Sequence, residues 1–137
     1  MILVDTSVIV AWLDPTHHHY KDCWAAIRHW AGRDQLAISC VTYAELSAGG
    51  RTREAVDEDL KGFVRLELDF DSAWRAGRTF RQYRTTRNDE PVLPDFFIRA
   101  QAATLNLPHL TNDRRGLAPW PDVDFLFPEK LNRRRQF

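Results

Sequence analysis

Residues 1–14, MILVDTSVIVAWLD, predict a strand followed directly by a helix, with an acidic residue at the junction. The first four residues are apolar, which is typical of a strand buried on both faces of a parallel sheet. Asp5-Thr6-Ser7 supplies side chains that favour a helix start, and Asp14-Pro15 ends the short helix predicted for residues 8–13. A buried strand that leads into a helix is the repeating unit of an α/β domain.

The same alternation of apolar runs and helical patterns continues along the chain. Further strands are predicted at residues 36–39, 64–68, 109–111 and 123–127. Helices are predicted at residues 20–31, 41–48, 51–62 and 95–105, and a long helix is predicted to start at Asp71-Ser72. Residues 88–94 are expected to form a loop and residues 130–137 a frayed basic tail. We therefore expect one α/β domain over residues 1–137, with a central, mostly parallel sheet of four to five short strands flanked by helices.

The composition fits a single globular domain with one core, since 44% of the 137 residues are hydrophobic and 12% are aromatic. Nineteen basic residues balance nineteen acidic ones, so any binding of nucleic acid must come from local patches. Cys23 and Cys40 lie in apolar surroundings without metal-ligand spacing, and both are expected to be buried free thiols. No signal-peptide pattern and no membrane-spanning run are present in the sequence, so we expect a cytoplasmic location and no membrane partner.

Four carboxylates stand at the predicted junctions. Asp5, Glu45 and Asp113 follow apolar strands closely, and Asp95 opens a helix. Each has a structural alternative: Asp5 and Asp95 can cap helices, Asp113 suits a turn, and Glu45 can pair with an arginine. Because ligands bind outside the carboxyl ends of parallel strands, we expect the four to converge. Crowded carboxylates repel one another unless a cation neutralises them, so the pattern predicts a hard divalent cation held by oxygen ligands.

Three blocks of the sequence resemble a known family. They are ILVDTSVIVAWL at residues 2–13, SCVTYAELSAGG at residues 39–50 and LPDFFIRAQAATLNLPHLTNDRRG at residues 93–116. With their spacing they resemble a PIN domain, and most closely the VapC-type ribonuclease toxins of type II toxin–antitoxin pairs. The resemblance covers nearly the whole chain. It departs from the family pattern at Phe96-Phe97, where smaller residues are common, and at His17-His18-His19, which is not a family feature.

The resemblance implies a single PIN-like domain and a metal-dependent endoribonuclease that hydrolyses RNA phosphodiesters with a metal-activated water. The cofactor would be Mg²⁺, with Mn²⁺ as the other possibility. The implied catalytic and metal-binding residues are Asp5, Glu45, Asp95 and Asp113. Asp5 and Asp95 would be the main direct ligands, whereas Glu45 and Asp113 would bind directly or through water.

The resemblance also suggests residues that bind the substrate. Thr6 and Thr111 match positions where the family often has a hydroxyl near the metal. Arg114 and Arg115 are candidates to bind a substrate phosphate or the carboxylates of a partner. Arg84 and Arg87 are further candidates for the same role.

The partners implied by the resemblance are a cognate antitoxin, the RNA substrate and a second copy of the chain in a homodimer. Two alternative functions share the fold: a housekeeping PIN nuclease in RNA processing or DNA flap cleavage, and a non-catalytic PIN-like interaction module. The run His17-His18-His19 is expected to be a loop that binds metal at most adventitiously. The helix faces that carry Trp12, Trp24, Trp30 and Trp74 are expected to be mostly core, with some covering a dimer seam or an antitoxin segment.

Overall fold

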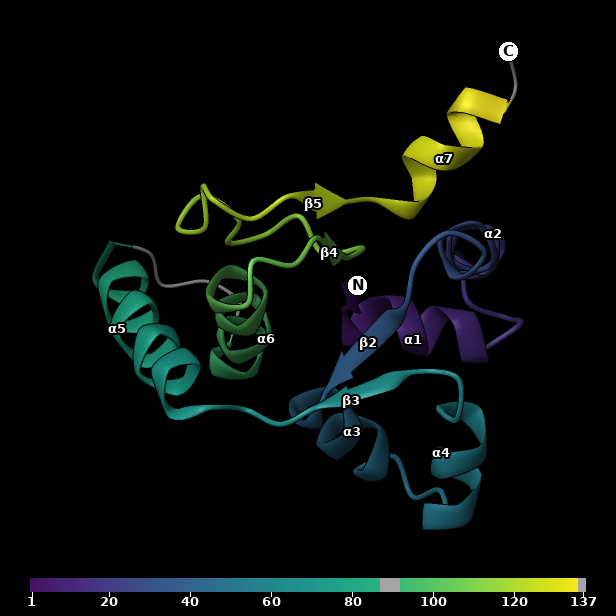
Figure 1. The fold of residues 1–137 in the computed structure, drawn as a ribbon, viewed down its shortest axis with the longest axis horizontal. Coiled ribbons are helices and arrows are strands. Elements are labelled where there is room, and N and C mark those ends of the chain that lie inside the picture. Colours follow the sequence, from purple (N-terminus) through teal and green to yellow (C-terminus); the bar gives the residue numbers. More distant parts are fainter. Residues whose placement is uncertain (87–91, 136–137) are drawn as a thin grey trace.

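The computed structural model describes residues 1–86 and 92–135, which form five strands and seven helices (Figure 1). The strands are β1 (Ile2–Val4), β2 (Leu36–Ser39), β3 (Val64–Leu66), β4 (His109–Leu110) and β5 (Phe125–Leu126). The helices are α1 (Thr6–Leu13), α2 (Tyr20–Ala31), α3 (Cys40–Ser47), α4 (Arg53–Asp59), α5 (Phe70–Thr86), α6 (Leu93–Thr104) and α7 (Pro128–Arg135). None of the described helices is long and apolar enough to cross a membrane.

The five strands form one parallel sheet in the order β3-β2-β1-β4-β5. The predicted α/β fold class is confirmed. From β1 in the centre, the chain builds outward through β2 and β3 and then crosses to the other side for β4 and β5. The strand order therefore reverses between β1 and β4. In open α/β sheets, the crevice at the carboxyl ends of such a pair of strands is where ligands bind.

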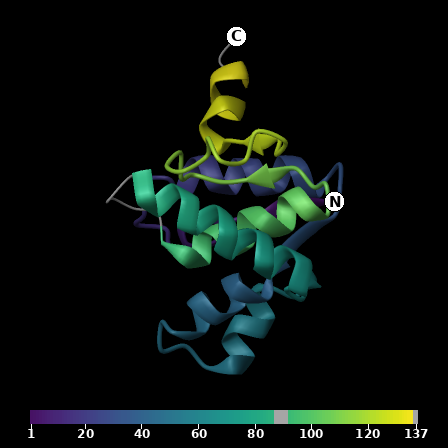
Figure 2. The same ribbon diagram turned by 90° about the vertical axis from the view of Figure 1, so that its left-hand side faces the viewer.

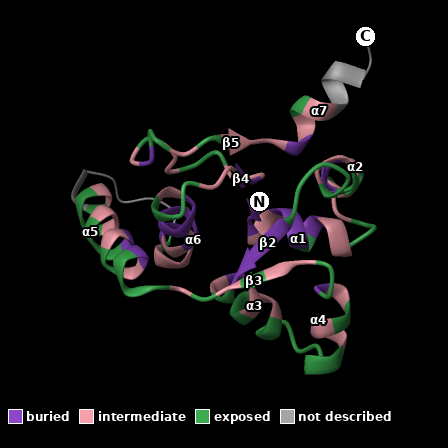
Figure 3. Ribbon diagram, in the orientation of Figure 1, coloured by how far each residue is buried: buried purple, intermediate pink, exposed green. Residues whose placement is uncertain are grey.

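Helices cover both faces of the sheet, with α1 and α2 on one face and α5 and α6 on the other (Figures 1 and 2). Strand β1 contacts both layers of helices, because successive side chains of a strand point to opposite faces of the sheet. Ile2 and Val4 pack in the core cluster that includes α1 and α2, whereas Leu3 packs with Ile98 of α6. The central strands are accordingly buried, while the helices present exposed outer surfaces (Figure 3).

The starts of α5 and α7 differ from the sequence prediction. Asp69, rather than Asp71-Ser72, caps α5, because its carboxylate accepts hydrogen bonds from the Ser72 backbone N (3.0 Å) and the Ser72 Oγ (2.5 Å). Helix α7 includes residues that were expected to lie in a frayed tail. Pro128 at its start fixes a helical φ, and Leu131 packs against the core that contains α2.

Three predicted burials are wrong. The Trp74 side chain is 68% exposed on the outer face of α5, and the Trp24 side chain is 45% exposed on α2. Ala76, on the opposite side of α5, is fully buried and takes the core contact instead, so amphipathicity determines which residue is buried. Cys40 is exposed at the first position of α3, whereas Cys23 is buried as predicted, and both are free thiols.

Candidate active site

The four predicted acids line one pocket at the carboxyl edge of the sheet. Asp5 follows β1, Asp113 follows β4, Glu45 lies in α3 after β2, and Asp95 is in the first turn of α6. This acidic pocket has a volume of about 460 Å³. Its other lining residues are Thr6, Ser7, Val10, His17, His18, His19, Asn112 and Arg115. The structure thus brings together every acid that the sequence singled out, although their catalytic roles stay predictions.

Asp5 is held rigidly behind the pocket and is only 5% exposed. Its Oδ2 accepts hydrogen bonds from the Ser7 Oγ (2.7 Å) and the Thr111 Oγ1 (2.8 Å). Its backbone N donates to the carbonyl of Leu110 in β4 (2.8 Å). The Asp5 side chain makes no capping bond to α1. The capping alternative therefore does not account for this buried carboxylate, whose orientation is fixed by two hydroxyl donors.

Thr111 joins two of the acids through one hydroxyl group. Its Oγ1 donates to Asp5 and accepts a hydrogen bond from the backbone N of Asp113 (3.0 Å). Asn112 is fixed to the same network, because its backbone N donates to the Ser7 Oγ (3.1 Å). The turn after β4 is thereby locked to the junction after β1, and it keeps Asp113 next to Asp5.

Asp95 carries the clearest electrostatic sign that the acids converge. The pKa of its carboxyl is raised to about 6, first by burial and then by the negative charge of Asp5, with Asp113 and Glu45 adding to the effect. Arg99, one turn further along α6, partly opposes this rise. The N-cap of α6 is Val92, so Asp95 lies within the first turn and is not the capping residue. A carboxylate that is repelled by three others is in an environment that favours a bound cation.

Asp113 is the acid that is already neutralised by protein groups. The Arg115 side chain donates to it through Nε (3.0 Å) and Nη2 (3.2 Å), and the buried Arg99 lies 3.8 Å from its Oδ2. Burial raises the pKa of Asp113, but the hydrogen bonds from Arg115 and the charges of both arginines outweigh burial and lower it. The Arg115 backbone N also donates to Asp113 (2.9 Å), so the turn alternative holds for this residue alongside its place in the pocket.

Glu45 pairs with a hydroxyl rather than with an arginine. The Thr6 Oγ1 donates to its Oε1 (2.8 Å), and the same hydroxyl lies 2.9 Å from the Thr42 Oγ1. Partial burial of the carboxyl raises the pKa of Glu45, as does the charge of Asp5, while the bond from Thr6 opposes the rise. The alternative that an arginine satisfies Glu45 is not observed among the described residues.

The donor set fits a hard divalent cation. In the described part of the chain, no three His, Cys, Asp or Glu side chains already lie close enough together to hold a metal ion. The four acids of the pocket nevertheless offer oxygen ligands, and the pKa values of Asp95 and Glu45 are raised, first by burial and then by the charges of neighbouring carboxylates. Mg²⁺ suits such a site, because it keeps several waters that can span the distance to the carboxylates.

Only some of the residues predicted to bind substrate lie at the acidic pocket. Thr6, Thr111 and Arg115 each bind one of the four acids. Arg114 does not line the acidic pocket: it pairs with Glu129, and its guanidinium lies 3.9 Å from the ring centre of Phe127. Arg84 is exposed on α5, and Arg87 lies outside the described residues.

Several residues that line the pocket or contact its acids were missed by the sequence analysis. Arg99 was not predicted, although its position four residues after Asp95 puts both on one helix face and signals a pair. Ser7 and Asn112 were treated as capping and turn residues, yet both belong to the network around Asp5. His17-His18-His19 was expected to be an ordinary loop, but all three histidines line the acidic pocket. No local signal in the sequence reveals that contact.

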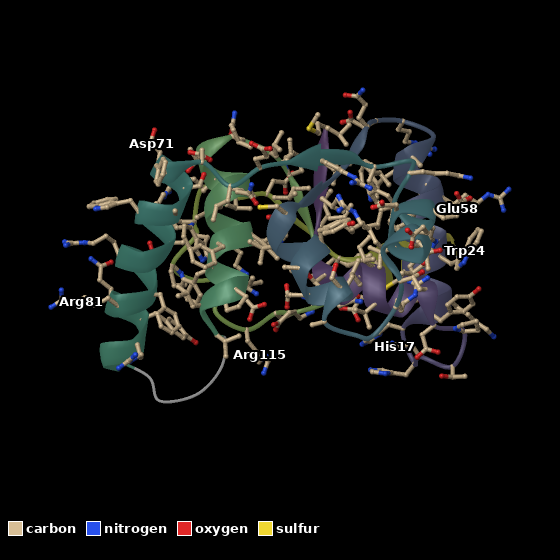
Figure 4. The ribbon with its side chains drawn as sticks, turned by 90° about the horizontal axis from the view of Figure 1, so that it is seen from below. His17, Trp24, Glu58, Asp71, Arg81 and Arg115 are labelled. Carbon is tan, nitrogen blue, oxygen red and sulfur yellow. The ribbon has the colours of Figure 1, made fainter. Side chains whose placement is uncertain are left out.

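A second, larger concavity lies between α1, α2 and the segment that joins α4 to β3. Its volume is about 810 Å³. We call it the Trp24 groove. Its apolar wall includes Trp12, Tyr20, Trp24, Ile27 and Phe63, and its polar rim includes Asp34, Glu58, Asp59 and Lys61. Figure 4 shows Trp24 and Glu58 on the same side of the molecule, away from Asp71 and Arg81 of α5.

The fold and the converging acids agree with a comparison against protein-family models. The model described as PIN domain matches residues 2–125. The chain belongs to the PIN-domain family. This match spans all four acids of the pocket, so the family expected from the sequence blocks is confirmed.

Solved structures share this PIN fold over nearly their whole length. A toxin–antitoxin complex from Klebsiella pneumoniae has 22% identity and a TM-score of 0.73, covering 93% of this chain and 98% of that chain. FitAcB from Neisseria gonorrhoeae has 24% identity and a TM-score of 0.71, with coverages of 94% and 99%. VapBC-5 from Mycobacterium tuberculosis, a member of the VapBC family of toxin–antitoxin systems, has 25% identity and a TM-score of 0.61, with coverages of 92% and 95%. A comparison with curated proteins gives no significant match.

Proposed function

We propose that this PIN-domain protein is a divalent-metal-dependent endoribonuclease and the toxin of a toxin–antitoxin pair. The observation that carries the nuclease is the convergence of Asp5, Glu45, Asp95 and Asp113 on one pocket at the carboxyl edge of a parallel sheet. Support for the toxin role comes from the similar folds in a Klebsiella pneumoniae toxin–antitoxin complex and in VapBC-5. A cytoplasmic location accords with this role.

The chemistry assigns different tasks to the four acids. Asp5 and Asp95 would hold the metal directly, and Asp113 and Glu45 would complete its shell directly or through water. When bound, Mg²⁺ or Mn²⁺ would supply Lewis acidity that lowers the pKa of a water and makes it a nucleophile at neutral pH. Ser7 and Thr111 keep the Asp5 carboxylate in one orientation, and Arg115 keeps Asp113 beside it.

The test is a cleavage assay on unstructured RNA with Mg²⁺ or Mn²⁺. We expect Asp5→Asn and Asp95→Asn each to slow cleavage at least about 100-fold, because each removes charge that binds the metal. Asp122→Asn is the matched control, since this side chain is 82% exposed and lies outside the acidic pocket. If both pocket variants cleave as fast as the wild type, the metal site is not where we place it.

Two further measurements separate this function from its alternatives. Intact RNA at saturating Mn²⁺, together with no metal-induced rise in thermal stability, would indicate a non-catalytic module. Growth arrest on expression, relieved by a small protein encoded directly upstream, would support the toxin role. Robust cleavage without arrest, and without such a neighbour, would indicate a housekeeping nuclease.

The Trp24 groove is the surface that we assign to the antitoxin. A groove of about 810 Å³ with Trp12, Trp24 and Phe63 in its wall is wide enough for an apolar segment of a partner chain. The rim acids Asp34, Glu58 and Asp59 are paired with the Met1 ammonium, Lys61 and Arg51, so the apolar wall rather than the charge of the rim supports this assignment. Aromatic side chains in a partly exposed pocket are typical anchors of an interface.

Substitution of the exposed tryptophan tests this assignment. Trp24→Asp should weaken antitoxin binding about 100-fold or more in calorimetry, whereas RNA cleavage by the free toxin should stay near the wild-type rate. Trp74→Asp is the matched control, because Trp74 is also exposed but lies on α5, outside the groove. Equal antitoxin affinity in the wild type and in Trp24→Asp would exclude the groove.

A further inference from the structure

The loop between α1 and α2 brings three histidines to the acidic pocket. His17, His18 and His19 line it together with the four acids. The rings of His17 and His18 are stacked, with centres 4.7 Å apart and planes inclined by 13°, and the ring of His19 is tilted by 42° against His18 at 4.0 Å. Figure 4 shows His17 and Arg115 along the same side of the molecule, in agreement with their shared pocket.

Short-range hydrogen bonds hold this loop in place. The Asp14 carboxylate accepts from the Thr16 backbone N (2.9 Å) and the Thr16 Oγ1 (2.6 Å). The His17 backbone N donates to the Asp14 carbonyl (3.0 Å), and the His19 backbone N donates to the His17 Nδ1 (3.1 Å). The imidazole rings are therefore positioned before any ligand arrives, which lowers the entropy cost of binding.

Most other polar groups of the acidic pocket are already engaged with the protein. Ser7 and Thr6 donate to acids, Arg115 is bound to Asp113, and the Asn112 amide donates to the Ser7 carbonyl (3.3 Å). Within the described residues, the ring nitrogens of His18 and His19 make no hydrogen bond, and His18 is exposed. The exposed His18 thus offers ring surface, and His18 and His19 offer ring nitrogens, that the fold itself leaves accessible.

We propose that His17, His18 and His19 form a stacking wall that binds a nucleobase of the RNA strand next to the acidic site. The inference rests on the nuclease function proposed above and deepens it. Aromatic rings bind single-stranded nucleic acid by stacking on successive bases, with little dependence on sequence. Because the histidines line the same pocket as the acids, the wall would meet a nucleotide that flanks the scissile phosphate. The histidines are positioning residues and take no part in bond cleavage.

The test separates stacking from other roles of the loop. Protein without a histidine tag is assayed on single-stranded RNA with Mg²⁺, for His18→Ala, His18→Phe and the triple alanine variant of residues 17–19. His18→Ala should raise KM about tenfold with kcat within twofold of the wild type, the triple variant should raise KM further, and His18→Phe should restore KM because it keeps a ring. His29→Ala is the control, because His29 packs on Trp30 in α2, outside the pocket.

The outcomes distinguish this proposal from the one on which it rests. If the wild type cleaves RNA and His18→Ala and the triple variant keep the wild-type KM, the wall is refuted while the nuclease stands. A rise in KM that His18→Phe does not reverse also refutes stacking. If the wild type neither binds nor cleaves RNA, both proposals fail. Unchanged circular dichroism and melting temperature in His18→Ala confirm that the loop variant is folded.

Discussion

The replacement of Asp95 by asparagine should stabilise the metal-free protein while it abolishes the metal site. The pKa of Asp95 is raised to about 6 from 3.8, because burial and the charges of Asp5, Asp113 and Glu45 disfavour its ionised form. At 1.36 kcal/mol for each pKa unit, this difference corresponds to about 3 kcal/mol of unfolding free energy at pH values well above 6. Asp95 is only partly buried, so screening by water reduces the expected gain to about 2 kcal/mol.

The sign of the pH dependence follows from the direction of the pKa shift. The folded pKa of Asp95 lies above the unfolded value, so the folded state binds this proton more tightly than the unfolded state. The associated stability is present below about pH 4 and is lost as the pH rises through about 6. The advantage of Asp95→Asn over the wild type should therefore be absent at pH 4 and reach its full size by about pH 7.5.

The assays are urea denaturation and thermal melting, both followed by circular dichroism in EDTA at several pH values between 4 and 7.5. At pH 7.5 we expect Asp95→Asn to melt about 6–8 °C above the wild type, given the size of this domain. Saturating Mg²⁺ should reverse the order, because a ligand at 100 times its Kd stabilises the wild type by about 2.7 kcal/mol and the variant by much less. Asp122→Asn should change the unfolding free energy by less than about 0.5 kcal/mol.

One result would refute this reasoning. If Asp95→Asn in EDTA at pH 7.5 is no more stable than the wild type, neither burial nor the neighbouring carboxylates disfavour the ionised form of Asp95. The four acids would then be local structural residues that share a surface, and the argument for a cation would lose its electrostatic basis.

Three further predictions concern the residues around the pocket and the exposed face of α5. Arg99→Leu should lower the unfolding free energy by about 1–3 kcal/mol, because it removes the hydrogen bond to the Gly116 carbonyl and a buried charge beside Asp113. In the same variant, NMR titration should show a pKa of Asp95 above about 6, because the charge of Arg99 lowers that pKa in the wild type. Thr111→Val should lower the unfolding free energy by about 1–3 kcal/mol and weaken Mg²⁺ binding in calorimetry, since one buried hydroxyl serves Asp5 and the Asp113 backbone. The predicted homodimer should involve the face of α5 where Phe70 is 95% exposed. Phe70→Glu should therefore yield monomers in light scattering, and a wild type that is itself monomeric would contradict this prediction.

The strands and most helices follow from local sequence patterns. Apolar runs such as Leu36–Ser39 predict the buried strands. The helical spacing of apolar residues predicts a helix over residues 20–31, and α2 has these bounds. Patterns of this kind identify an apolar face but not how much of it a neighbour covers. Trp24 and Trp74 illustrate the limit, because whether a large aromatic is buried depends on packing partners that only the folded chain supplies.

The acids of the pocket could be predicted because each stands at a strand end or a helix start, and the parallel sheet brings such positions to one edge. Arg115 was also predicted, but Arg99 and the histidine run were not. Arg99 is buried by tertiary contacts in the interior of α6, and its role depends on the position of Gly116 and Asp113 after β4. The histidine run reaches the pocket only because the turn at Asp14 fixes the loop between α1 and α2.

The four acids do not contribute equally to a cation site. Asp5 is held by two hydroxyl donors and Asp113 by two arginines, so the protein already stabilises both in fixed positions. At Asp95, the charges of three carboxylates raise the pKa, and only the positive charge of Arg99 lowers it. We therefore predict that a bound cation would gain most of its binding free energy from Asp95, and that Asp5 would set its position. Such a site would be less stable without a metal than with one, as is common where an active site trades stability for function.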